Sequence, residues 1–135
     1  MNKFKYLSMA ALLGIGLTAQ ALAEDIYVIA HPAAGVTAAD VREIFLGEKQ
    51  FAGSVKIIPV DNTAIQEVFL SKVMKMDAAK YSTTWTKKAF RDGLSPPAPK
   101  SGGDADVTNY VKSTPGAVGY VTTKPGGGVA VVEKY

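Results

Sequence analysis

Cysteine is absent from the 135 residues of this chain, and histidine occurs once. Without cysteine there is no disulfide framework, no thiol chemistry and no attachment point for a lipid anchor, so stability has to come from packing. The single histidine, His31, stands directly before Pro32 and has no cysteine to activate. It cannot by itself form a metal site of His and Cys ligands, and we interpret it as a polar residue that ends a strand.

Sequence motifs of catalysis are missing as well. No serine lies in a Gly-x-Ser-x-Gly elbow, which excludes an α/β-hydrolase. The run Gly126–Gly128 precedes a strand pattern and is not followed by Lys-Ser or Lys-Thr, so it is not a phosphate-binding loop. Asp104 and Asp106 lack the remaining ligands of a calcium loop. We therefore expect no enzyme activity, no metal and no cofactor.

Net charge is small. The chain has 15 Lys and Arg against 12 Asp and Glu, so its net charge is 15 − 12 = +3. Two of the cations, Lys3 and Lys5, belong to the leader described next, and without them the balance is 13 − 12 = +1. Such a balance gives no reason to expect a nucleic-acid partner. The cluster of Lys87, Lys88 and Arg91 is typical of a solvated helix face, or of a site that attracts an anion or an acidic partner.

Long hydrophobic runs are limited to the first 23 residues, MNKFKYLSMAALLGIGLTAQALA. A basic start, an apolar run and a small-x-small ending predict a cleavable signal peptide over residues 1–23 and a periplasmic location. The run is shorter than the ~20 apolar residues of a membrane-spanning helix, so we expect no membrane insertion after cleavage. Residues 24–135 are long enough for one domain and too short for two lobes around a cleft.

Beyond the leader, apolar patterns with strand and helix spacing alternate. Strands are predicted over residues 26–30, 55–60, 117–121 and 129–132. Helices are predicted from Thr37 to Gly47, from Thr63, from Asp77 to Phe90, and from Asp104. The Pro- and Gly-rich segment of residues 95–103 is expected to be irregular. The pattern indicates an α/β domain with a small mixed sheet and helices on both faces. The aromatic residues on helical stripes are expected in the core: Phe45, Phe69, Tyr81, Trp85, Phe90 and Tyr110.

The polar turn of Asp61, Asn62 and Thr63 joins the second predicted strand to a helix. A helix N-terminus offers free backbone N–H groups and a favourable dipole, and can therefore bind an anion. The same residues are also ordinary N-caps, which stabilise a helix by ~1 kcal/mol and need no ligand. On these residues alone, capping is the simpler interpretation.

The order of motifs resembles the periplasmic phosphate-binding proteins of ABC transporters. It runs from VREIFLG at residues 41–47 through Pro59-Val60-Asp61, Phe69, Trp85 and Phe90 to TPGAVGYV at residues 114–121, the most specific piece. The resemblance covers nearly all of residues 24–135, and it is to one lobe of those two-lobed proteins and to short single-lobe relatives. It implies one lobe of a type II periplasmic binding-protein fold.

In the family the matching strand ends in Arg-x-Asp-Gly-Ser-Gly-Thr, which holds the phosphate. Here Asp61 keeps its place and Phe69 keeps its interval from Asp61. Thr63 stands where the family has Ser, and Pro59 stands in the Arg position. Asn62 and Ala64 replace the two glycines, and Ile65 replaces the final threonine. Losing the Arg removes a bidentate partner for an oxyanion.

Two functions follow as hypotheses. The first is a periplasmic solute-binding module that recognises phosphate or a related oxyanion weakly at Asp61, Asn62, Thr63 and Ala64, with His31 and Ser101 as distant second choices. Its partners would be an ABC transporter or an envelope sensor protein, and a homodimer could supply the second lobe. The alternative is a ligand-free interaction protein or sensory adaptor that keeps the lobe fold.

Overall fold

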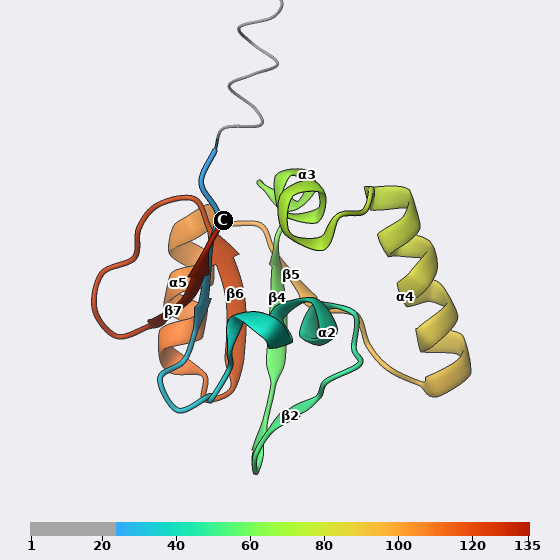
Figure 1. The fold of residues 1–135 in the computed structure, drawn as a ribbon, viewed down its shortest axis with the longest axis horizontal. Coiled ribbons are helices and arrows are strands. Elements are labelled where there is room, and N and C mark those ends of the chain that lie inside the picture. Colours follow the sequence, from blue (N-terminus) through green and yellow to red (C-terminus); the bar gives the residue numbers. More distant parts are fainter. Residues whose placement is uncertain (1–23) are drawn as a thin grey trace, which may run out of the picture.

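The structure, a computed structural model, describes residues 24–135. The predicted signal peptide, residues 1–23, lies outside the described residues. A five-stranded sheet in the order β5-β4-β6-β1-β7 forms the centre (Figure 1). Its strands are β1 (Tyr27–Ala30), β4 (Ile58–Asn62), β5 (Ala98–Lys100), β6 (Ala117–Val121) and β7 (Ala130–Lys134). A small separate hairpin consists of β2 (Phe51–Ala52) and β3 (Val55–Lys56).

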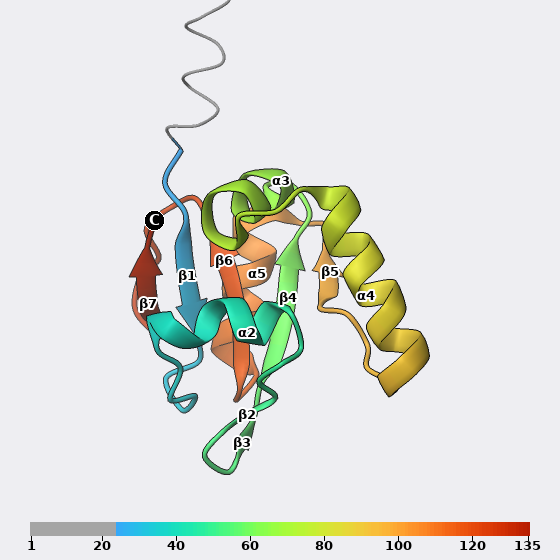
Figure 2. The ribbon, with the colours of Figure 1, turned by 45° about the vertical axis from the view of Figure 1, so that its right-hand side comes forward.

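The sheet is mixed. Strand β4 pairs in parallel with both β5 and β6, while β1 pairs antiparallel with β6 and β7. Helix α5 (Gly103–Ser113) covers one face, and the short helices α2 (Val41–Phe45) and α3 (Gln66–Phe69) lie on the other (Figure 2). The predicted α/β class, with a mixed sheet and helices on both faces, is confirmed. None of the helices in residues 24–135 is long and apolar enough to cross a membrane.

Two apolar clusters hold the layers together. Under α2 and α3, the rings of Phe69 and Tyr120 stack 3.7 Å apart, and Phe45 meets both edge-on. Under α5, Val107 and Val111 pack against Val60 and other sheet residues. These clusters explain the apolar stripes of the sequence, because each stripe faces the sheet.

Strand β4 begins later than predicted. Val55 and Lys56, which were predicted to start this strand, instead form β3 of the β2–β3 hairpin. Pro59 lies inside β4, a strand with neighbours on both sides. The position is tolerated because Ile58 directs its backbone N–H toward Gly116 on the β6 side, so the nitrogen of Pro59 faces the β5 side, where β5 pairs with β4 only from Val60 onward.

Several other predictions were wrong in detail. The segment expected to be irregular contains β5, because parallel pairing with β4 imposes a strand on Ala98–Lys100 despite Pro99. The helix expected from Thr63 begins at Gln66, since β4 continues through Asn62. Asp104 lies within the first turn of α5, and its N-cap is Gly102. Phe90, expected in the core, is 96% exposed.

Helix α4 (Ala78–Asp92) stands to one side of the sheet (Figure 1). The helix lies where a helix over Asp77 to Phe90 was predicted. Asp77 caps its start by accepting from the backbone N–H of Lys80, and Gly93 ends it in a left-handed conformation. Only Tyr81 and Trp85 of this helix are buried. The indole N–H of Trp85 donates to the carbonyl of Phe45 at 3.0 Å, and its ring lies against Gly47. The helix is thus attached by its first half.

Replacing Gly47 by alanine should loosen this attachment. A Cβ at Gly47 would lie 2.6 Å from the Trp85 ring, and its φ of +72° strains any side chain. We expect a loss of ~2–4 kcal/mol in the free energy of unfolding, the sum of left-handed strain and overpacking. Gly53→Ala is the matched control, since its φ is +60° and its Cβ would meet nothing within 4 Å. Urea unfolding followed by the fluorescence of Trp85 measures both, and equal losses would contradict the contact.

Candidate functional site

A groove of about 900 Å³ opens between α4 and β5, beside the carboxyl end of β4. We call it the α4–β5 groove. Its lining combines one face of α4, the proline segment before and within β5, and the end of β4. The lining residues are Asp61, Thr63, Gln66, Leu70, Ala78, Tyr81, Ser82, Trp85, Thr86, Ala89, Phe90, Pro96, Pro97 and Pro99. The location matters because open α/β sheets bind ligands outside the carboxyl ends of their strands.

Asp61 lies at the base of the groove and is 4% exposed. Its two carboxylate oxygens accept hydrogen bonds from two tyrosines that are far away in sequence. The hydroxyl of Tyr120, on β6, donates to Oδ1 at 2.8 Å, and the hydroxyl of Tyr81, on α4, donates to Oδ2 at 3.0 Å. Asp61 therefore joins α4 to two strands of the sheet, and both of its oxygens already have a donor.

No described cation forms an ion pair with Asp61. Burial raises the pKa of its carboxyl above the ordinary value, and the hydrogen bonds from Tyr120 and Tyr81 partly offset that effect. Burial and the neighbouring Asp61 charge raise the pKa of both tyrosines far above the usual range. The two hydroxyls therefore keep their protons and act only as donors to the carboxylate.

Asn62 points to the opposite side of the sheet, as the alternation of side chains along a strand requires. Its Nδ2 donates to Asp104 Oδ1 and to the carbonyl of Tyr120, each at 3.1 Å. Asp104 also accepts from the backbone N–H groups of Thr122 and Thr123 and from the Thr122 hydroxyl. Burial opposes ionisation of Asp104, but these hydrogen bonds outweigh it and hold its pKa below the ordinary value. Asn62 and Asp104 thus fasten α5 to the sheet.

Thr63 and Ala64 are exposed at the rim of the turn. The Thr63 backbone N–H donates to the carbonyl of Lys100 at 3.1 Å, and the Thr63 hydroxyl donates to the same oxygen at 3.2 Å. The backbone donor that the anion hypothesis assigns to Thr63 is therefore engaged by β5. Asp61 and Thr63 line the groove, whereas Asn62 and Ala64 do not.

The remaining candidates lie away from the groove lining. His31 follows β1, and its Nδ1 accepts the backbone N–H of Ala33, which closes a turn. Ser101 is exposed directly after β5. Among the three cations near the end of α4, Lys88 contacts Glu48 at 3.9 Å and Arg91 contacts Asp92 at 3.1 Å. Lys88 and Arg91 thus contact carboxylates of different segments.

The chemistry of the groove is apolar. Asp61 is the one charged residue in its lining, and no Lys, Arg or His belongs to it. Tyr81, Trp85 and Phe90 contribute aromatic surface, and three prolines form the opposite wall. No group of three His, Cys, Asp or Glu in the described part of the chain is placed to hold a metal ion. The groove can remove apolar groups from water, but it offers no cation to an anion.

Sequence reasoning found Asp61 and Thr63 but missed the groove. A usable signal was present: Pro96, Pro97 and Pro99 stand beside a helix whose exposed positions Ala78, Ser82, Thr86 and Phe90 recur at i, i+4 spacing. No sequence pattern predicted the hydrogen bond between Asp61 and Tyr120, since these residues lie 59 positions apart.

Tyr120→Phe should expose the dependence of the fold on Asp61. The substitution keeps the stacked ring but leaves one oxygen of the buried carboxylate without a donor, at a cost of ~1–3 kcal/mol in the free energy of unfolding at pH 7. The control is Tyr110→Phe, since Tyr110 is only partly buried and its hydroxyl is not a donor to Asp61. Denaturant unfolding measures both, and similar losses would contradict the assigned role.

The same carboxylate predicts a pH dependence. Because the folded-state pKa of Asp61 lies above its unfolded value, the ionised group costs stability at neutral pH. That cost disappears as the pH falls through the folded pKa, where the folded state takes up the proton first. Asp61→Asn lacks this group, so the stability of the wild type relative to the variant should rise on acidification. Unfolding curves from pH 7 to pH 4 test this, and a difference that is constant with pH would refute it.

Comparisons with known proteins leave the family open. No protein-family model matches the chain, and no curated protein is significantly similar to it. The likeness to phosphate-binding lobes therefore rests on the motifs of the sequence alone. The function of the protein has to be inferred from the geometry of the described residues.

Proposed function

We propose that this chain is an interaction module that docks an apolar surface of another protein into the α4–β5 groove, in the manner of an adaptor. One observation carries the proposal: the groove at the carboxyl end of β4 is lined by aromatic and proline side chains and contains no cation. Burying apolar area is the main favourable term in most protein association. A groove of this composition gains that term, whereas a small anion does not.

The state of Asp61 supports the same conclusion. An anion at the groove base would meet a carboxylate, and both oxygens of that carboxylate are already hydrogen-bonded to Tyr81 and Tyr120. Like charges at short range repel strongly in a poorly solvated site. The base of the groove is therefore unfavourable for phosphate.

Weak oxyanion recognition at the turn is the second candidate function. The exposure of Thr63 and Ala64 favours it, since an anion could reach them from solvent. Binding there would have to displace the Lys100 carbonyl from Thr63. It would use the rim of the turn, away from the groove base.

The groove can be tested with Nile red, a neutral apolar dye whose fluorescence increases in apolar sites. Trp85 is the only tryptophan and lies in the groove wall, so its emission reports the same event. We expect saturable dye binding that Thr86→Arg weakens at least tenfold by placing a charge in the groove. Thr83→Arg is the matched control on the same helix, because Thr83 is exposed and does not line the groove. Equal affinities for the two variants would overturn the proposal.

The oxyanion candidate predicts a different response. Phosphate, but not sulfate or chloride at matched ionic strength, should raise the melting temperature, and Thr63→Ala should abolish that shift. Without an anion, Thr63→Ala should cost only ~1 kcal/mol, the value of one exposed hydrogen bond to Lys100. Absence of a phosphate-specific shift in the wild type would eliminate this candidate and leave the groove unaffected.

A further inference from the structure

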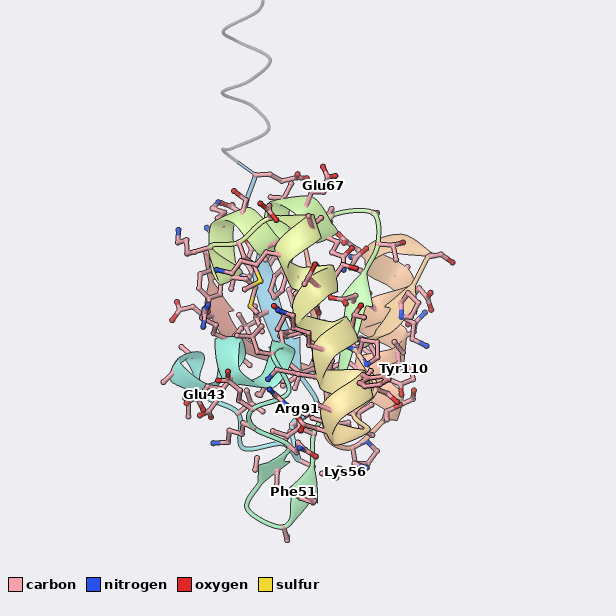
Figure 3. The ribbon with its side chains drawn as sticks, turned by 90° about the vertical axis from the view of Figure 1, so that its right-hand side faces the viewer. Glu43, Phe51, Lys56, Glu67, Arg91 and Tyr110 are labelled. Carbon is pink, nitrogen blue, oxygen red and sulfur yellow. The ribbon has the colours of Figure 1, made fainter. Side chains whose placement is uncertain are left out.

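Helix α4 has an exposed face that carries no charge. Ala78, Ser82 and Thr86 follow one another at i, i+4 spacing along the groove, and Phe90 comes one turn later. All four are exposed, and Phe90 is 96% exposed, the most exposed of the large apolar residues in the described chain. Figure 3 looks onto α4 with Arg91 near its carboxyl end, and no other helix or strand covers it from that side.

This face is complementary to itself. If two copies of α4 pack antiparallel about a two-fold axis midway along the stripe, position 78 meets position 90 of the other copy, and position 82 meets position 86. The large Phe90 then lies against the small Ala78 at both ends of the stripe, and the small residues Ser82 and Thr86 meet in the middle, so no two bulky side chains collide. A symmetric dimer requires this property, because one surface patch must fit an identical patch.

The charges permit such a contact. Lys80, Lys87 and Lys88 are on α4 but do not line the groove. Residues 24–135 carry a net charge of only 13 − 12 = +1, so two copies repel each other weakly. Helix pairing would therefore bury apolar and hydroxyl groups without burying an unpaired cation.

Strand addition at the neighbouring sheet edge is the less suitable alternative. Lys100 directs its carbonyl toward Thr63, so in β5 the residue that faces outward is Pro99. Proline has no backbone N–H to donate, and β5 comprises only Ala98–Lys100. The edge next to the groove is thus a poor template for another strand.

We infer that the partner of the α4–β5 groove is a second copy of this chain, and that the contact is an antiparallel α4 pair in which each Phe90 enters the groove of the other copy beside Ala78. The inference rests on the proposed function and names its partner. A 15-residue helix is ~22 Å long. One helix pair of that length is small beside the ~800 Å² per partner of a standard interface. The dimer is therefore weak and depends on concentration.

Sedimentation velocity of the chain from Glu24 to Tyr135, between ~1 µM and ~1 mM, tests the inference over the affinity range of weak complexes. The wild type should pass from monomer to dimer. Phe90→Ala removes the inserted ring, and Ala78→Glu places a carboxylate where the ring packs. Each change occurs twice in a symmetric dimer and should raise the dissociation constant about a hundredfold.

Matched controls are available for both substitutions. Phe51→Ala removes another exposed phenylalanine, which lies on β2. Thr84→Glu adds the same carboxylate to the same helix, at a position that does not line the groove and lies on the side of α4 opposite the stripe. Both controls should dimerise like the wild type. Circular dichroism checks that every variant is folded.

A mixture of Phe90→Ala and Ala78→Glu gives the sharpest readout. One of its two contacts again pairs Phe90 with Ala78, so the mixture should associate more tightly than either variant alone. A wild type that stays monomeric over the whole range, or equal effects of Ala78→Glu and Thr84→Glu, would overturn the dimer. If Nile red still binds such a monomer in a Thr86-dependent way, the groove keeps its proposed function and only the partner is wrong.

Discussion

The hydrogen bonds that satisfy the Asp61 carboxylate constrain the rest of this structure. A buried charge without partners is costly, so the fold has to bring a donor to each of its oxygens. Tyr81 on α4 and Tyr120 on β6 supply them. Tyr120 can do so only because Phe69 stacks on its ring and Phe45 closes the edge. The two carboxylate oxygens of Asp61 therefore constrain the positions of α4, of β6 and of the aromatic cluster of Phe45, Phe69 and Tyr120.

The α4–β5 groove exists because only part of α4 is attached to the rest of the protein. Tyr81 and Trp85 hold the first half of α4, and no residue of its second half is buried. On the other side, β5 is the edge strand of the sheet, and among the described residues no further strand lies between β5 and the helix. The space between them stays apolar because the prolines and the small residues of α4 carry no charge. The attachment of α4 by its first half thus also leaves open the α4–β5 groove, on which the proposed function of the protein depends.

Local patterns of the sequence predicted much of this architecture. Three features depend on neighbouring residues, and each lies where expected: the helix start at Thr37, the stripe of Tyr81 and Trp85, and the strand within TPGAVGYV. The errors came from long-range contacts. β5 forms only because β4 pairs with it. Asp104 was expected to cap its own helix, but its carboxylate accepts hydrogen bonds from Thr122 and Asn62. Phe90 has helical spacing, but the body of the protein does not extend far enough to cover it.

The two candidate functions place opposite demands on the backbone N–H of Thr63. An oxyanion at the turn needs the Thr63 N–H, which donates to the Lys100 carbonyl and holds the end of β5 in the sheet. Releasing it costs ~0.5–1.5 kcal/mol before any binding energy is gained, and Pro59 supplies no charged partner to repay that cost. Moreover, Pro99 of β5 forms part of the groove wall, so an anion that frees Thr63 loosens the surface that docks an apolar partner. The two functions are therefore opposed, and the hydrogen bond that keeps β5 in place favours the groove.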